Sequence, residues 1–240
     1  MTKGKIYKII AALENVYHSK EEDSFNKNIL DVLIAIKLSQ NTTDKSSFKA
    51  YSALKKEYKT WEKVIDAPLD KIKGLIRVCG LANTKAPNIQ NMLRDMKAKY
   101  GSLDLNFLKE KSNNEVYEEL LQYNGLGVKT ISCVLGFAMG RSVFPVDTHV
   151  HRILNRTGIV DTKTPDKTFE AATKIIPEDD KVSFHTNLIK FGRNYCRAVN
   201  PLCNRCFIYK ECEWEEKKFY KEKNFIGEIQ ENNFIIVEHI

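Results

Sequence analysis

The sequence predicts an all-α protein, and two observations carry this prediction. Apolar residues recur every three or four positions through most of the chain of 240 residues, which is the spacing of one helix face. Glycine and asparagine interrupt this pattern at short intervals, as expected of turns between helices. On this basis we expect about ten to twelve helices. Only Phe234-Ile235-Ile236-Val237 has the composition of a strand, and it is expected either as one short strand or as an apolar tail.

The clearest helical stripes lie in the middle of the chain. One consists of Ile89, Met92, Leu93, Met96 and Tyr100, and another of Ile131, Val134, Leu135 and Ala138. Pro87 is expected in the first turn of the earlier helix, where its missing N–H costs little, with Asn83 in the gap before it. A further amphipathic helix is expected at the N-terminus, and others at 27–39, 45–58, 69–78, 112–122, 147–157, 165–176 and 180–195.

Composition narrows the class of protein and its partners. The 38 Lys and Arg residues exceed the 31 Asp and Glu residues, so the formal net charge is +7. This surplus favours a polyanion such as nucleic acid, although a lysine-rich surface on any soluble protein would give the same charge. The N-terminal segment lacks a secretory signal, and no apolar run approaches the roughly 20 residues that span a bilayer. We therefore expect an intracellular protein, in the cytoplasm and nucleoid or in a nucleus, that is monomeric and has no membrane partner.

Four cysteines near the C-terminus have the spacing of a metal site. Intracellular thiols stay reduced, so the six cysteines of the chain need an explanation other than disulfides. Cys196-x6-Cys203-x2-Cys206-x5-Cys212 can surround a four-iron–four-sulfur cluster or a tetrahedral zinc ion. The cluster is favoured because zinc sites more often pair two Cys-x2-Cys steps, but the spacing alone leaves both open. The other two, Cys79 and Cys133, lie on apolar stretches and are expected in the core.

Cations accompany these cysteines. Arg193, Arg197, Arg205 and Lys210 lie in or beside the cysteine segment. A metal-bound loop would hold such side chains at the surface, where phosphates are their natural partner. The alternative is that they only solvate the loop.

A second candidate site is the turn Asn124-Gly125-Leu126-Gly127. A helix is expected to end near Gln122 and another to begin near Lys129. Two glycines allow a sharp turn and a close approach of the backbone, and the unpaired N–H groups of the new helix can bind an anion. The segment 115–140 therefore predicts a helix–hairpin–helix that holds a DNA phosphate, although an ordinary corner between helices has the same pattern.

Lys129 and Asp147 are the candidate catalytic residues. The positive end of the helix dipole disfavours the charged amine of Lys129 and so favours its nucleophilic form. Asp147 is expected as the N-cap of the helix that runs through Arg156, where backbone N–H groups keep a carboxylate ionised. There it can stabilise positive charge on a sugar or orient a nucleophile. The alternatives are a solvated surface lysine and an aspartate that only caps its helix.

These residues carry a resemblance to endonuclease III, in the helix–hairpin–helix DNA glycosylase superfamily. Four blocks match in order over roughly residues 5–213: LSQNTTDKS (38–46), GLANTKAPNI (80–89), the hairpin with Lys129 through VDTHVHRILNRTG, and GRNYC followed by the other three cysteines (192–212). The cysteine spacing is that of the family, and it favours the iron–sulfur cluster over zinc. The cluster is expected to be structural and to be bound by Cys196, Cys203, Cys206 and Cys212.

The resemblance implies a fold of two all-α lobes with DNA in the cleft between them. One lobe, at 28–140, would be a helical barrel that contains the helix–hairpin–helix. The other would join 1–27 to 141–213 and carry the cluster. An extension at 214–240 is longer than in the family, and its charged sequence is expected to be loosely attached.

The resemblance also implies a bifunctional DNA glycosylase with abasic-site lyase activity in base excision repair. Lys129 matches the catalytic lysine, which attacks the sugar and forms a Schiff base before β-elimination nicks the strand, and Asp147 matches the catalytic aspartate. The expected partner is double-stranded DNA that contains damaged bases, chiefly oxidised pyrimidines, or abasic sites.

The expected DNA-binding residues come from several blocks. Leu81 matches an apolar wedge that fills the space of the flipped nucleotide. The family's second wedge is a glutamine, and here either Gln40 or Asn41 can take that place. The remaining DNA-binding candidates are Gly125, Gly127, Arg193 and Arg197.

Two other classes of function remain as alternatives. One is a monofunctional glycosylase of the same fold, acting on uracil or mismatched thymine, in which Asp147 activates water. The other is a non-catalytic DNA-binding protein that uses the hairpin and the cluster as a clamp. The sequence specifies neither the lesion nor the opposite base.

Overall fold

The computed structural model describes residues 2–18, 27–229 and 235–240. In this part of the chain every regular element is helical: twelve α-helices and six short 3₁₀ turns. The all-α prediction is therefore confirmed. The strand considered at 234–237 is wrong for the residues described, because Ile236–Glu238 forms a 3₁₀ turn, η6. Its neighbours are helices, which offer no strand edge for it to pair with.

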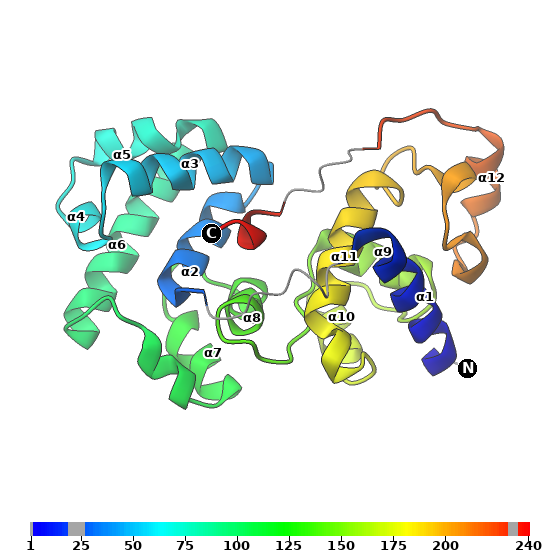
Figure 1. Ribbon diagram of the computed structural model, residues 1–240, viewed down its shortest axis with the longest axis horizontal. Coiled ribbons are helices and arrows are strands. Elements are labelled where there is room, and N and C mark those ends of the chain that lie inside the picture. Colours follow the sequence, from blue (N-terminus) through cyan, green and yellow to red (C-terminus); the bar gives the residue numbers. More distant parts are fainter. Residues whose placement is uncertain (1, 19–26, 230–234) are drawn as a thin grey trace. The chain divides into compact units, whose positions relative to one another are not determined.

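The chain divides into two compact units. Unit 1 combines Met1–Asp23 with Ser142–Asn233, and unit 2 combines Ser24–Arg141 with Phe234–Ile240. Figure 1 shows α1 and α9 to α12 in unit 1, and α2 to α8 in unit 2. The C-terminal extension is therefore shared between the units. Among the described residues, no helix combines the length and the apolar character needed to cross a lipid bilayer.

Unit 2 is built around one apolar helix. Its helices are α2 (Ile29–Ser39), α3 (Asp44–Glu57), α4 (Glu62–Ile65), α5 (Leu69–Ile76), α6 (Ala82–Tyr100), α7 (Asn113–Leu121) and α8 (Val128–Phe137). The α2 helix is mostly apolar and is buried almost throughout, with contacts to α3, α6 and α8. Asn28 caps it, since its side-chain oxygen accepts the N–H groups of Leu30 and Asp31 at 3.0 and 3.1 Å.

The start of α6 differs from the prediction. The helix begins at Ala82, so Pro87 lies in its second turn and Asn83 lies inside the helix. The carbonyl of Leu81 accepts the N–H groups of Thr84 and Lys85 at 3.0 and 2.9 Å, which closes the first turn early. Pro87 then removes only the N–H that would have bonded to Asn83. The short helices α4 and α12 have no counterpart in the sequence prediction, because their periodic stretches are brief.

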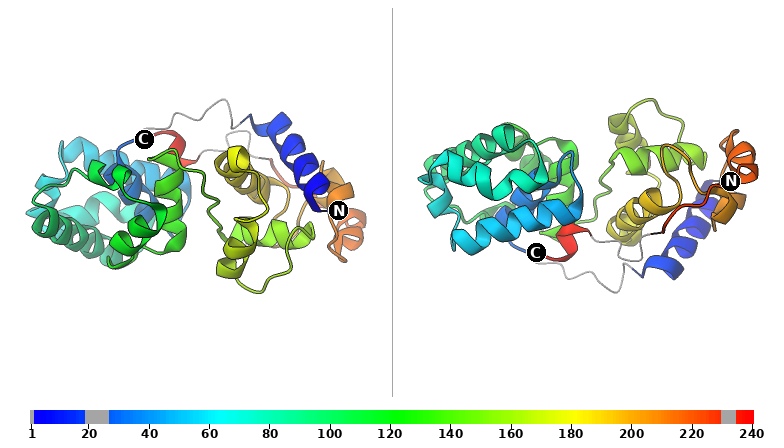
Figure 2. Two further views of the ribbon diagram at one scale, coloured as in Figure 1. Left: turned by 90° about the horizontal axis from the view of Figure 1, so that it is seen from below. Right: turned by 90° about the horizontal axis from the view of Figure 1, so that it is seen from above.

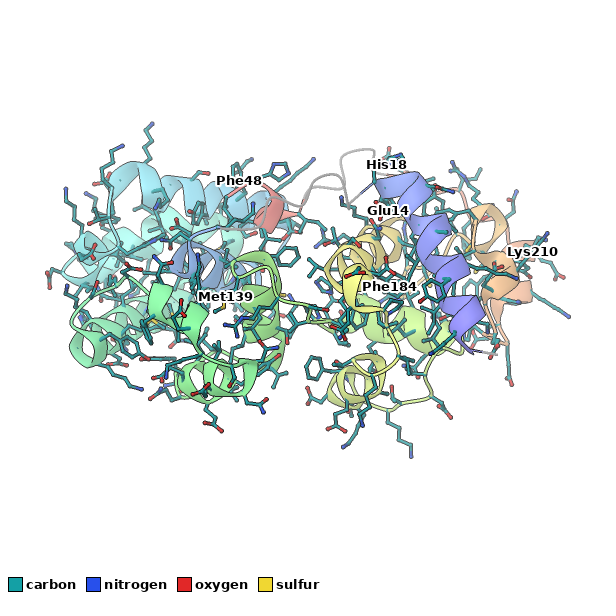
Figure 3. All side chains as sticks on the ribbon, turned by 60° about the horizontal axis from the view of Figure 1, so that its bottom comes forward. Glu14, His18, Phe48, Met139, Phe184 and Lys210 are labelled. Carbon is teal, nitrogen blue, oxygen red and sulfur yellow. The ribbon has the colours of Figure 1, made fainter. Side chains whose placement is uncertain are left out.

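Unit 1 has α11 (Lys181–Asn194) at its centre. The others are α1 (Thr2–Tyr17), α9 (Thr148–Arg156), α10 (Pro165–Ala172) and α12 (Lys217–Glu222). The apolar stripe of α1 packs with buried side chains of α11, among them Phe184, and Glu14 accepts a hydrogen bond from Asn187 at 2.8 Å (Figure 3). At Gly192 a Cβ would lie 2.8 Å from Nδ1 of His149. Glycine therefore allows α11 to approach α9 closely.

The last residues of the chain are anchored to unit 2. Ile235, Ile236 and Val237 are buried, and η6 contacts α2 and α3. The views of Figures 1 and 2 agree in placing this red turn beside these two helices. Phe48 of α3 faces it, with its ring 6.3 Å from that of His239 (Figure 3). The expectation of a loosely attached extension is wrong for these residues, because their apolar side chains are covered.

Candidate active site

The predicted hairpin is present in unit 2 between α7 and α8. Gly125 has φ of 79°, a left-handed conformation that favours glycine, and Leu126 N–H closes the turn on the carbonyl of Tyr123 at 3.1 Å. Gly127 is the N-cap of α8 and has extended backbone, so only Gly125 needs glycine for its conformation. Both glycines are exposed, and a Cβ at Gly127 would meet nothing within 4 Å. The backbone is therefore accessible to a partner at this turn.

Lys129 is the second residue of α8, which agrees with the prediction that a helix begins near this lysine. Its side chain is partly exposed, whereas Thr130 to Phe137 behind it are buried and anchor the helix in unit 2. The amine therefore extends from a rigid support in the first turn of a helix, where the dipole acts on a cation.

The neighbouring turn after α2 separates the roles of Gln40 and Asn41. The amide of Gln40 donates to the carbonyl of Gly125 at 3.2 Å, so Gln40 braces the hairpin. Asn41 is exposed and has φ of 54°, a conformation that asparagine tolerates better than most residues. The two adjacent amides therefore have different surroundings.

Leu81 lies at the tip of a third turn in unit 2. Its side chain is 56% exposed, and its backbone has φ of 52°, directly after Gly80 with φ of 69°. A left-handed conformation costs a leucine about 1–2 kcal/mol, so the surrounding structure must hold it. Lys85 provides such support, because its buried amine donates to the carbonyls of Cys79 and Leu38 at 2.9 and 2.8 Å. Lys85 thereby connects the Leu81 turn to the end of α2.

Asp147 is the N-cap of α9 in unit 1, which confirms that part of the prediction. Its carboxylate accepts the N–H groups of His149 and Val150 at 2.8 and 2.9 Å and is partly exposed. Burial lowers the pKa of the neighbouring His149. The carboxylate is thus held by backbone donors at one end of a packed helix. Asp147 lies in unit 1 and Lys129 lies in unit 2. That their side chains act at one site stays a prediction.

Two arginines connect α9 to the cysteine segment. Arg152 donates through Nε and a terminal nitrogen to the carbonyl of Cys196 at 2.9 and 2.7 Å. Arg156, one turn later, donates to the sulfur of Cys196 at 3.4 Å and to the carbonyl of Arg197 at 2.8 Å. Its guanidinium also lies 3.7 Å from the ring centre of Trp214. Sequence patterns do not indicate this link, because it joins residues about 40 positions apart along the chain.

The four cysteines of the predicted metal site line one cavity in unit 1, together with Ile153, Phe191 and Ile208 among others. Burial, and then repulsion from the other cysteines, raise the pKa of Cys203 to about 11. Burial likewise raises the pKa of Cys206 to about 12. Within the described ranges no three His, Cys, Asp or Glu side chains form a ligand group for a single metal ion.

The two arginines proposed to bind DNA differ in their surroundings. Arg193 is exposed on α11. Arg197 donates to the carbonyl of Glu228 in the C-terminal extension and to that of Arg193. Part of the donor capacity of Arg197 is thus used within unit 1.

Comparison with known proteins identifies the family of this chain. A family model of HhH-GPD superfamily base excision DNA repair proteins matches residues 34–178. Endonuclease III of Thermotoga maritima is 37% identical over 83% of this chain and 87% of its own length. Endonuclease III of Escherichia coli K12 is 34% identical over 90% of this chain and 99% of its own.

Solved structures give the same result. A non-covalent endonuclease III–DNA complex matches with a TM-score of 0.77 at 28% identity, covering 91% of this chain and 99% of the other. A trapped covalent endonuclease III–DNA intermediate matches equally well, with a TM-score of 0.77. The helical fold and the hairpin define a helix–hairpin–helix protein of the base excision repair class. Within that class, the chain belongs to the endonuclease III family of the HhH-GPD superfamily.

Proposed function

We propose that this protein is a bifunctional DNA glycosylase and abasic-site lyase of base excision repair. The observation that carries the proposal is the position of Lys129 in the first turn after the hairpin, in a chain of the endonuclease III family. The covalent DNA intermediate of a related endonuclease III supports a mechanism that bonds enzyme to substrate. The proposed substrate is double-stranded DNA with an oxidised pyrimidine or an abasic site, and the protein acts on it inside the cell as a monomer.

Lys129 is the nucleophile of this reaction. Its neutral amine attacks C1′ of the extruded nucleotide, and the electron pair of the broken glycosidic bond leaves with the base, which takes up a proton. Opening of the sugar ring leaves a Schiff base between Lys129 and C1′. The imine acidifies the C2′ hydrogen, and loss of that proton expels the 3′ phosphate by β-elimination, which cuts the strand.

Asp147 supports the first of these steps. Departure of the base develops positive charge on the sugar, and a fixed carboxylate stabilises that charge. Its two backbone hydrogen bonds, at 2.8 and 2.9 Å, hold the carboxylate in one orientation before the substrate arrives. Asp147 thus caps α9 and takes part in catalysis.

Three turns of unit 2 form the proposed DNA-binding surface. The hairpin, with Gly125 and Gly127, offers backbone N–H groups to a phosphate without reading the base sequence. Leu81, which is exposed and conformationally constrained, is the apolar wedge that offsets part of the cost of unstacking. Asn41 is the inserted amide, because Gln40 is already engaged with the hairpin.

We assign the four cysteines to a four-iron–four-sulfur cluster with a structural role. The four thiols line one shared cavity, and their order Cys-x6-Cys-x2-Cys-x5-Cys is the spacing on which the resemblance to endonuclease III rests. When bound, the cluster supplies folding energy to the loop. Arg152 and Arg156 connect that loop to α9, so the loop also supports the helix that carries Asp147.

A borohydride trap tests the proposed function. Wild-type protein incubated with a duplex containing an oxidised pyrimidine should give a covalent protein–DNA product when the Schiff base is reduced. Lys129→Ala should abolish trapping and lower strand cleavage by about a thousandfold or more. Lys97→Ala, which removes an exposed lysine in the last turn of α6, is the matched control and should behave as wild type.

Each other outcome identifies a different function. Release of the base without any trapped product would mean a monofunctional glycosylase, in which water activated by Asp147 replaces the amine. Lys129→Ala protein that matches wild type in every assay would mean a DNA-binding protein without catalysis.

A further inference from the structure

Lys37 is a buried lysine that the proposed mechanism does not use. It lies near the end of the central helix α2, between Ile36 and Leu38, and is only 3% exposed. Transfer of an ammonium group to apolar surroundings costs free energy unless it is well bonded. Accordingly, burial lowers the pKa of Lys37 to about 8. Stability alone would be served better by an apolar side chain at this position.

The amine of Lys37 is bonded to the hairpin. It donates to the carbonyl of Asn124 at 2.7 Å, a contact between residues 87 positions apart. In the described part of the chain no carboxylate forms an ion pair with it. A Cβ on Gly125 would lie 2.7 Å from the same nitrogen, so the amine is packed directly against the turn. Lys37 therefore contacts the two residues at the bend of the hairpin.

A second donor from the same region acts on the next carbonyl. The amide of Gln40 donates to the carbonyl of Gly125 at 3.2 Å. The carbonyl of Asn124 thus accepts a hydrogen bond from Lys37 of α2, and the next carbonyl accepts one from Gln40, the residue directly after α2. In a trans peptide unit the N–H points opposite to the C=O. Because Lys37 holds the carbonyl of Asn124, the N–H of Gly125 is directed away from α2.

We infer that Lys37 is a positioning residue, whose amine holds the hairpin turn in the conformation that presents its backbone N–H groups to a DNA phosphate. This inference rests on the proposed role of the hairpin in DNA binding. Lys37 acts through the turn and does not touch the DNA itself. Its loss should therefore weaken binding equally for damaged and undamaged duplexes, because phosphate contacts carry no sequence information.

The test compares Lys37→Met with wild type and with Lys97→Met. Methionine keeps the length of the side chain and removes the amine, and Lys97→Met removes the same charge from an exposed position of unit 2. Relative to Lys97→Met, we expect Lys37→Met to bind an uncleavable abasic-analogue duplex and an undamaged duplex about tenfold more weakly. At saturating DNA, the single-turnover rate should stay within about twofold of wild type.

Two further measurements separate positioning from a structural role. Thermal unfolding of Lys37→Met at pH 7 should occur at the same temperature as in wild type or at a higher one. Amide hydrogen exchange should accelerate in residues 123–127 and remain unchanged in the core of unit 2.

The inference is overturned if Lys37→Met binds DNA as tightly as Lys97→Met. It is equally overturned if DNA binding and unfolding temperature fall together, because Lys37 would then be a structural residue. Failure of the proposed function has a different signature: wild type itself would not be trapped on damaged DNA, whatever the ratio between the variants. Wild type that binds no duplex at all would overturn both.

Discussion

Gln40 and Asn41 are adjacent amides with different surroundings. Both residues are exposed, but the amide of Gln40 is bonded to the hairpin, whereas Asn41 has a left-handed backbone conformation. A residue that enters the DNA must have its side chain available to the duplex. The hydrogen bond of Gln40 to the hairpin is the reason why we propose Asn41 as the inserted amide.

Substitution of Asn41 provides the corresponding prediction. Asn41→Gly removes the side chain and keeps the positive φ without strain, so its stability should equal that of wild type. We expect base removal from a damaged duplex to slow about tenfold, because no side chain then fills the gap that the extruded nucleotide leaves in the duplex. The measurement is a single-turnover rate. Gln40→Ala should instead weaken the binding of all duplexes, and the reverse pattern would assign the wedge to Gln40.

The buried amine of Lys37 predicts a pH dependence of stability. Its pKa is about 8 in the folded protein because of burial, against 10.5 for an ordinary lysine. Below pH 8 the amine of Lys37 is protonated in both the folded and the unfolded state, and its burial as a charged group destabilises the folded state. Between pH 8 and 10.5 the unfolded chain binds more protons, so the contribution of Lys37 to stability rises with pH.

Denaturant unfolding of wild type and Lys37→Met across this range measures the effect. The unfolding free energy of wild type minus that of Lys37→Met should be constant below pH 8. Between pH 8 and 10.5 this difference should rise by about 1–3 kcal/mol. A difference that does not change across this window would show that the amine is not desolvated.

At the scale of elements, α9 and the cysteine segment form one assembly. Asp147 begins the helix, and Arg152 and Arg156 on the same helix bind the backbone and the sulfur of Cys196. Gly192 allows α11 to pack closely on the other side. The helix that begins at Asp147 and the cysteine segment are therefore held together by these contacts.

Loss of one cysteine should accordingly affect folding and DNA binding together. Cys203→Ser removes a proposed cluster ligand, and we expect loss of iron, a lower unfolding temperature and weaker DNA binding. Iron and sulfide analysis of the purified protein, with duplex binding, checks this. Cys133→Ser, which alters a buried thiol of α8 in unit 2, should retain iron. A Cys203→Ser protein without iron that still folds and binds DNA would refute a structural cluster.

At the scale of the whole molecule, the C-terminal extension contributes residues to both units. Residues 217–222 form α12, which packs against the 3₁₀ turn at Cys203–Arg205 in unit 1. The last residues belong to unit 2, where η6 covers part of α2 and α3. Lys27 donates to the carbonyl of the terminal residue, Ile240, at 3.0 Å and closes this end of the chain onto the same unit.

Two isoleucines of the extension provide a matched test of this anchoring. Ile236 is 2% exposed against unit 2, whereas Ile226 is 95% exposed. Ile236→Ala should destabilise the protein by about 2–4 kcal/mol, since it leaves a cavity, and Ile226→Ala should have an effect near zero. Thermal or denaturant unfolding measures both. Equal effects of the two substitutions would mean that the terminal segment contributes nothing to unit 2.

The sequence by itself determined the features that depend on near neighbours along the chain. Helices follow from spacings of three and four residues, and the cap at Asp147 from N–H groups two and three positions away. The glycine turn before Lys129 and the cysteine spacing are equally local. For this reason the all-α class, the hairpin and the candidate lysine could be predicted without a structure.

Only the tertiary structure decided which distant groups meet. Lys37 donates to a carbonyl 87 residues away along the chain, and Arg152 donates to a carbonyl 44 residues away. No periodic pattern in the sequence predicts such pairs. Ile236–Glu238 forms a 3₁₀ turn that contacts α2 and α3, although the composition of the segment around it is that of a strand. Packing overrode local preference there, since a short apolar segment adopts whichever conformation buries it.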